Sequence, residues 1–176
     1  MRWLTLLVLL ATTAVACTDT TATESVGYSP VTGIIVRSES AVGDLGCGPA
    51  AGQVFKYVAV LRGPSDLGYD AGADAGLATP DLVLGIGVYD CFSDGLFHEL
   101  AVDASYGIEL FGFSKAVWDQ NGGAIGTLAG ALPASAAEAS TKFLELKPIS
   151  KTSCSAVQRT GIQTVASCPA PQHVTQ

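Results

Sequence analysis

Asp90, His98 and Glu99 form the one compact group of titratable side chains in the sequence. A carboxylate that orients an imidazole is half of an acyl-transfer triad, so these residues could serve a periplasmic or surface hydrolase. The nucleophile is missing, because the sequence has no Gly-x-Ser-x-Gly motif and Cys91 is expected to be oxidised. We therefore expect Asp90 and His98 to form a cross-strand pair at the end of a hairpin, with catalysis as the alternative.

Trp118 is the second candidate for recognition. It lies in Lys115-Ala-Val-Trp-Asp-Gln-Asn, a segment that runs from a predicted strand into a predicted loop. An exposed indole at such a place would suit a sugar or a peptide. Phe111 and Phe113 alternate on one side of the preceding strand, which is typical of core residues. We expect Trp118, Asp90 and His98 at a binding surface.

A glycine-rich segment at 63–80 is the only stretch with the acidity of a Ca²⁺ loop. Its carboxylates, with the one that follows it, are Asp66, Asp70, Asp74 and Asp81. They lack the Asp-x-Asp-x-Asp spacing that gathers ligands in one tight turn, so a solvated loop is predicted. With two His and one Met, we expect no metal site and no cofactor. A net charge of −7 without a basic run argues against nucleic acid.

The cysteines are odd in number, which needs an explanation in an exported protein. They are Cys17, Cys47, Cys91, Cys154 and Cys168. Cys154 and Cys168 lie seven residues on either side of Gly161, the centre of a predicted hairpin, which places them opposite each other. Four cysteines allow three pairings, and we predict the 154–168 and 47–91 disulfides. The first cysteine is then the spare one.

The N-terminal residues account for the spare cysteine. Arg2 provides a positive start, residues 3–10 are apolar and small residues follow at 11–16, as in a secretion signal. The apolar run is shorter than the roughly 20 residues of a membrane-spanning helix. Val15-Ala16-Cys17 resembles the lipobox of bacterial lipoproteins. Ala14-Val15-Ala16 also fits an ordinary signal peptidase, so a soluble secreted or periplasmic protein is the alternative.

The lipoprotein resemblance implies a location and a partner. Cys17 would become the acylated N-terminus, and acyl chains bind a bilayer with about 0.8 kcal/mol per buried CH₂. Thr18 follows it instead of Asp, which in this family favours the outer membrane over the inner. Residues 17–30 are polar and are predicted to be a flexible tether. A further partner would be an envelope protein or a glycan.

β-Strand signals follow one another after Pro30. Strands are predicted at 31–38, 53–62, 82–92, 96–103, 107–117 and 142–147, with a closing hairpin at 152–168. Residues 53–62 are apolar on both faces, as in an inner strand. A short helical turn is predicted at Ser135, which has capping-box spacing to Glu138. The Gly-, Ala- and Ser-rich stretch 121–141 is predicted, like 63–80, to be a surface loop.

Ser93-Asp94-Gly95 is predicted to turn the chain between 82–92 and 96–103. Pairing Phe92 with Leu96 makes one face of this hairpin apolar except near the tip. The resulting cross-strand pairs are Asp90–His98, Val88–Leu100 and Ile86–Val102. The alternative two-residue loop would oppose Asp90 to Glu99, a destabilising pair of like charges.

About eight strands without a long amphipathic helix predict an all-β fold. We expect a disulfide-stapled antiparallel β-sandwich over 31–170, immunoglobulin-like in general architecture. A signal peptide at 1–16 and the tether would precede this single domain, and a disordered tail at 171–176 would follow it. The predicted function is a non-catalytic binding or structural module anchored in the envelope. The alternatives are a carrier of an apolar small molecule and the hydrolase described above.

Overall fold

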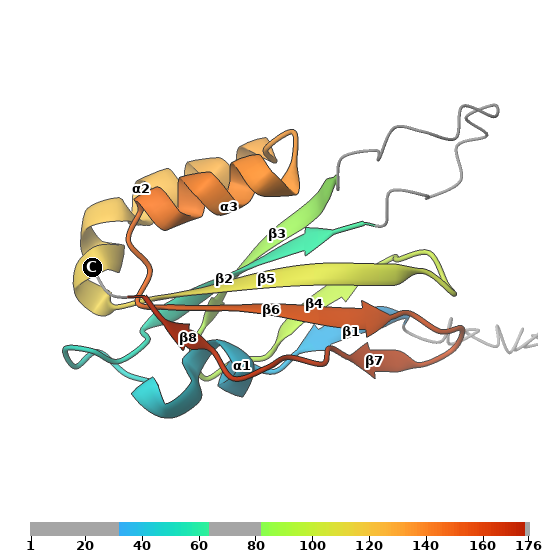
Figure 1. The fold of residues 1–176 in the computed structure, drawn as a ribbon, viewed down its shortest axis with the longest axis horizontal. Coiled ribbons are helices and arrows are strands. Elements are labelled where there is room, and N and C mark those ends of the chain that lie inside the picture. The colour runs from blue at the N-terminus through green and yellow to red at the C-terminus, as the bar shows by residue number, and fades with distance from the viewer. Residues whose placement is uncertain (1–31, 64–81, 175–176) are drawn as a thin grey trace, which may run out of the picture.

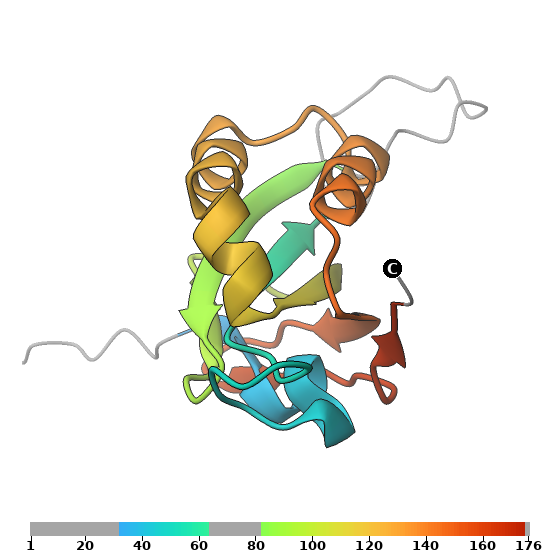
Figure 2. The same ribbon diagram turned by 90° about the vertical axis from the view of Figure 1, so that its left-hand side faces the viewer.

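A computed structural model describes residues 32–63 and 82–174, which form three layers (Figures 1 and 2). The middle layer is a sheet of β3 (Val83–Asp90), β2 (Lys56–Arg62), β5 (Ser105–Phe113), β6 (Ser150–Val157) and β8 (Gln172–His173), in that order. Helices α2 (Lys115–Ala131) and α3 (Ala136–Glu145) cover one face. A smaller sheet of β4 (Gly95–His98), β1 (Gly33–Val36) and β7 (Gln163–Val165) packs on the other. A short helix α1 (Ser38–Val42) and the 3-10 turn η1 (Gly43–Leu45) follow β1.

Two hydrophobic cores lie between these three layers. The core between the sheets includes Ile34, Val36, Tyr57, Ala59, Leu61, Phe97, Ile108 and Leu110. The core between the large sheet and the helices includes Val58, Val60, Phe111, Phe113, Ile125, Ala139 and Phe143. Every residue of β2 from Tyr57 to Leu61 is buried. The prediction of an inner strand at 53–62 is therefore confirmed, and two facing sheets are present that are mostly antiparallel.

The helices make the fold mixed α/β, so the prediction of an all-β sandwich is wrong in this respect. Residues 121–141 are helical for most of their length and do not form a loop, and 142–147 contains the end of α3 and no strand. Ser114 ends the predicted strand by capping α2 at the Val117 amide (3.4 Å). Ser135 caps α3 at the Glu138 amide (3.2 Å), where a helical turn was predicted.

The predicted hairpin of β3 and β4 is also wrong. β3 pairs with β2 in the large sheet, whereas β4 pairs with β1 in the small one. Ile86 of β3 packs toward the helices, while Phe97 and Leu100 belong to the core between the sheets. The predicted hairpin would place Ile86 and Leu100 on one face, so the chain changes sheets between Cys91 and Asp94. The pairs Asp90–His98, Val88–Leu100 and Ile86–Val102 do not form.

The closing hairpin is divided between the two sheets. Ser155 and Ser167 exchange two backbone hydrogen bonds (3.0 and 2.8 Å), but β7 then joins β1 in a parallel pair. The C-terminal segment returns to the large sheet as β8, and the Val174 amide donates to the Ile149 carbonyl (3.0 Å). The expectation of a disordered tail from 171 is therefore wrong for residues up to Val174.

Two disulfides join Cys47 to Cys91 and Cys154 to Cys168, as predicted. The first connects the segment before β2 to the end of β3, and the second lies beside the β6–Ser167 contact. Disulfides form and persist in oxidising compartments. The protein is therefore extracytoplasmic.

The stability of the fold is expected to decline above about pH 10, the pKa of an exposed tyrosine. Burial raises the pKa of Tyr57 and Tyr89, whose hydroxyls donate to the carbonyls of Ser93 (2.8 Å) and Leu96 (3.2 Å). The unfolded chain then loses these protons before the folded one does, so rising pH favours unfolding. Urea midpoints between neutral pH and pH 11 measure this loss. The double variant Tyr57→Phe/Tyr89→Phe should show a smaller alkaline loss than the wild type.

Candidate functional site

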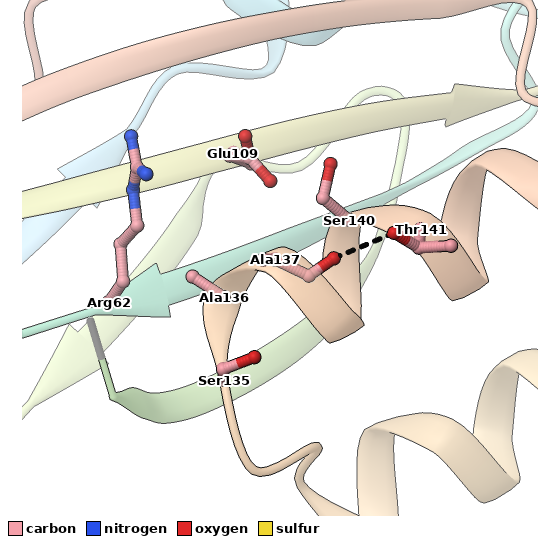
Figure 3. A pocket seen from close by; sticks show the side chains of 7 residues that line it. All are labelled: Arg62, Glu109, Ser135, Ala136, Ala137, Ser140 and Thr141. Carbon is pink, nitrogen blue, oxygen red and sulfur yellow. Dashed lines mark hydrogen bonds between the residues drawn. The ribbon is translucent and has the colours of Figure 1, made fainter. Parts of the chain in front are cut away.

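A pocket of about 500 Å³ lies between the N-terminal half of α3 and the large sheet (Figure 3). We call it the α3 pocket. It is lined by Arg62, Glu109, Ser135, Ala136, Ala137, Ser140 and Thr141. Two opposite charges and three hydroxyl groups therefore face one cavity.

Strand alternation brings the charged side chains of this pocket to the helix side of the sheet. Arg62 follows Val58 and Val60 on the same face of β2, and Glu109 precedes Phe111 on the same face of β5. Arg62 lies over Gly107, where a Cβ would collide with its Nε. A glycine at this position of β5 therefore makes room for the guanidinium at the pocket.

Glu109 is the most unusual side chain of the pocket because it is a buried carboxylate, with the residue 8% exposed. Its Oε1 lies 3.6 Å from Lys151 Nζ, which comes from β6. Its Oε2 is buried and has no hydrogen-bond partner among the described residues. A buried acceptor left unsatisfied costs about 1–3 kcal/mol. This oxygen has almost no accessible surface, so a molecule in the pocket would not reach it without a movement of the side chain.

Lys151 and Ser140 form a hydrogen bond of 2.9 Å, Nζ to Oγ, across the edge of the pocket. Ser–Lys pairs catalyse acyl transfer when the lysine is neutral and accepts the serine proton. Here Lys151 Nζ donates to Ser140 Oγ and also lies 3.6 Å from Glu109 Oε1, so it joins α3 to β5 as well as to its own strand β6. The arrangement therefore favours Lys151 as a link between α3 and the sheet over a role as a general base.

The first turn of α3 borders the same pocket. Ser135 is the N-cap, and Ala136 and Ala137 are the first two helical residues. Amides at these positions have no carbonyl partner within the helix. The helix dipole places partial positive charge at this end. The Glu138 carboxylate, which accepts from the Ala134 amide (3.0 Å), already offsets this charge at the first turn.

The structure separates the residues that the sequence grouped for catalysis. His98 and Glu99 line a shallow pocket of about 430 Å³ with Leu84, near the start of β3. Asp90 lies six residues further along β3, about 20 Å away at the rise of a strand. Asp90 forms an ion pair with Lys56 and not with His98. The predicted Asp–His pair is wrong.

Trp118 lies in α2 and is half-buried, so the expectation of a loop position is wrong. It packs against the core between the helices and the large sheet. Lys56 Nζ lies 5.6 Å from its ring centre, as in a cation–π contact. The indole therefore contributes to packing at the end of the sheet opposite to the α3 pocket.

Several predicted features lie outside the described residues: the signal peptide, Cys17, the tether and the acidic residues Asp66, Asp70, Asp74 and Asp81. Within the described parts of the chain, no three His, Cys, Asp or Glu side chains gather as metal ligands would. No helix in those parts is long and apolar enough to cross a membrane.

The sequence analysis did not identify Glu109 or Lys151 as site residues, although the sequence around Glu109 contains an indication of its role. It is the one charged residue in Gly-Ile-Glu-Leu-Phe-Gly-Phe, a segment that otherwise reads as a buried strand. Charged residues are almost never fully buried without a partner or a function. Ser140 carried no comparable signal, because 121–141 was predicted to be a surface loop. Ser135 was predicted only to begin a short helical turn.

Comparison with known proteins identifies no relative of this chain. No protein-family model, no curated protein and no solved structure matches the chain.

Proposed function

We propose that this protein is a non-catalytic binding module of the bacterial cell envelope that holds a small polar ligand in the α3 pocket. The observation that carries the proposal is the α3 pocket, which has a volume of about 500 Å³ and is lined by the charged residues Arg62 and Glu109 and by three hydroxyl-bearing residues. Concave sites with a few convergent polar groups are where small molecules bind in proteins. The separation of Asp90 from His98 supports binding over hydrolysis.

The proposed anchor is a lipid on Cys17. The two disulfides use the other four cysteines, so this residue alone is left for acylation. The lipobox-like Val15-Ala16-Cys17 supports the same assignment, and Thr18 favours the outer membrane. A membrane is then one partner. An envelope protein or glycan that delivers or receives the ligand is the other.

The intact mass of the exported protein tests the anchor. We expect a chain that begins at Cys17, is heavier by its acyl groups and takes up no thiol label without reduction. The control is the Cys17→Ala variant, which should carry no lipid. An unlipidated wild-type chain with one reactive thiol would show a soluble secreted or periplasmic protein instead.

A ligand screen by NMR tests the binding site. The exported protein is mixed with small polar compounds (amino acids, sugars, nucleosides and dicarboxylates) while its amide chemical shifts are recorded. We expect at least one compound to shift the amides of Ala136, Ala137 and Glu109 in a saturable way. If no compound moves these amides, the pocket is not a binding site and the proposed function fails.

A further inference from the structure

We infer that one end of the domain docks on the surface of a zwitterionic phospholipid bilayer through exposed aliphatic side chains. This inference rests on the lipid anchor of the proposed function and adds an orientation to it. It follows from three observations: exposed apolar residues gather at one end of the sheets, all five lysines lie toward the other end, and the chain enters the domain at the apolar end.

Exposed apolar residues gather at the end of the sheets where β1, β3, β5 and β7 begin and where β2, β4 and β6 end (Figure 1). We call this the β1 end. Six large aliphatic residues there are 37–55% exposed: Leu82, Leu84, Val102, Val157, Ile162 and Val165. Removing apolar surface from water is favourable by about 25 cal/mol per Å². A gathering of exposed apolar residues at one place marks an interaction surface.

Hydrogen bonds hold two loops of the β1 end side by side. The Asp103 amide donates to the Gln158 carbonyl (2.7 Å), and the Gln158 amide donates to the Ala104 carbonyl (3.0 Å). The Gln158 side chain is buried and donates to the Ile162 carbonyl (2.9 Å). The exposed side chains of Val102 and Ile162 therefore belong to loops that are already fixed, so little conformational entropy is lost when these loops enter an interface.

Leu132, at the end of α2, adds a strained position to the same end. Its segment lies there because Ser135, three residues later, lines the α3 pocket with Arg62, the last residue of β2. Leu132 has a φ of 42° and is exposed, and Glu99 and Asp103 in the loop before β5 have a φ of 57°. Glycine usually occupies this left-handed region at the end of a helix, because it has no Cβ. Residues held in such conformations gather at functional surfaces.

The charges of the domain are distributed unevenly between its two ends. All five lysines lie toward the end opposite to the β1 end: Lys56, Lys115, Lys142, Lys147 and Lys151. Among the described residues of the β1 end outside the α3 pocket, the charged side chains are those of Glu99, Asp103 and Arg159. Anionic lipids attract clusters of basic residues, and these described residues form no such cluster. The surface that suits this end is therefore a bilayer without net charge.

The chain enters the domain at the same end. β1 begins with Gly33, which pairs with His98 at the end of β4. Cys17, the proposed lipid site, precedes residue 32 by 15 positions, and a chain of this length spans at most about 55 Å. A lipid on Cys17 would thus keep the β1 end close to the bilayer. Because linkage of this kind makes the local concentration of the membrane high, weak apolar contacts suffice for docking.

A spin-labelled lipid tests the contact on the exported, lipidated protein. The protein is placed in phosphatidylcholine nanodiscs with and without a spin-labelled phosphatidylcholine, and its backbone amide signals are recorded by NMR. We expect the spin label to remove the amide signals of Val102, Val157 and Ile162. The amide of Phe92, at the opposite end, should keep its signal although this residue is 80% exposed. Exchange of part of the lipid for phosphatidylglycerol should not strengthen the loss of signal.

Two matched variants test the same contact from the side of the protein. Val157→Ser/Ile162→Ser removes exposed apolar side chains from the β1 end and is expected to lower the ratio of docked to undocked protein at least about tenfold. The amide signal of Val102 should then return in the presence of the spin label. Phe92→Ser removes an exposed apolar side chain from the opposite end and should leave the loss at Val102 unchanged. All replaced side chains are exposed, so both variants are expected to fold.

The outcomes separate the docking from the anchor. If the protein is lipidated but the amides of Val102, Val157 and Ile162 lose no more signal than that of Phe92, the docking is wrong and the anchor stands. If the intact mass shows no lipid, the anchor is wrong, and the same nanodiscs are added to the unlipidated chain. Retained signals then exclude the docking as well, whereas lost signals support it. If concentrating the Cys17→Ala variant without lipid shifts these amides, a second copy covers the β1 end and the docking is wrong.

Discussion

Replacing Phe143 with alanine is expected to lower the free energy of unfolding by about 4 kcal/mol. The ring is fully buried between α3 and the large sheet, with its centre 5.4 Å from the ring centre of Phe111 on β5. Truncation removes the transfer free energy of the ring and leaves a cavity that the rigid sheet cannot close. Urea denaturation of the wild type and of Phe143→Ala measures the difference.

Leu144 supplies the matched control, because it is the next residue of α3 and is 39% exposed. Leu144→Ala should change the free energy of unfolding by no more than about 0.5 kcal/mol. Equal losses of unfolding free energy in the two variants would contradict the finding that α3 packs on the large sheet through Phe143. Since α3 carries Ser135, Ala136 and Ser140, Phe143→Ala should also weaken ligand binding at the α3 pocket, whereas Leu144→Ala should not.

The strands were predictable from sequence because burial on both faces leaves a continuous apolar run. Residues 53–62 carry such a run, and β2 is the strand covered on both faces, by the helices and by the small sheet. The helices were not predictable in the same way. α2 contains Gly122, Gly123, Gly126 and Gly130, and glycine costs about 1 kcal/mol relative to alanine in a helix. Packing of Ile125 and Val117 on the sheet outweighs this local preference.

The pattern of apolar residues does not show which of the two sheets a strand belongs to. An apolar face looks alike whether it meets a helix or a second sheet, so Ile86 and Leu100 seemed to belong together. In the structure the two side chains lie on opposite sides of the large sheet. The disulfides were predictable nonetheless, because the choice of Cys154 with Cys168 depended only on the local turn near Gly161.

The site was harder to predict than the fold. Arg62, Glu109 and Lys151 lie on three strands, and their common face follows from strand pairing that the sequence analysis did not assign. Ser140 joins them only because α3 packs across this face. Asp90 and His98 were close in sequence and therefore seemed related. Their separation shows that short spacing is weak evidence where the chain changes sheets.

Removing the Cys47–Cys91 disulfide by Cys47→Ala/Cys91→Ala should lower the free energy of unfolding by about 4 kcal/mol. The bond closes a loop with a sequence separation of 44, so its loss frees the unfolded chain of a large constraint. Cys91 is also buried, at 4% exposed, beside the turn where the chain leaves the large sheet. Urea denaturation of the variant and the wild type, both without reductant, gives the comparison.

The second disulfide provides the internal control, because it closes a loop with a separation of only 14. Chain entropy predicts a loss of about 3 kcal/mol for Cys154→Ala/Cys168→Ala, smaller than for the first pair. In the folded state, the paired Ser155 and Ser167 hold the same strands together without the bond. A larger loss for the 154–168 pair than for the 47–91 pair would contradict the entropic account. The loss would then arise from the native packing around Cys154 and Cys168.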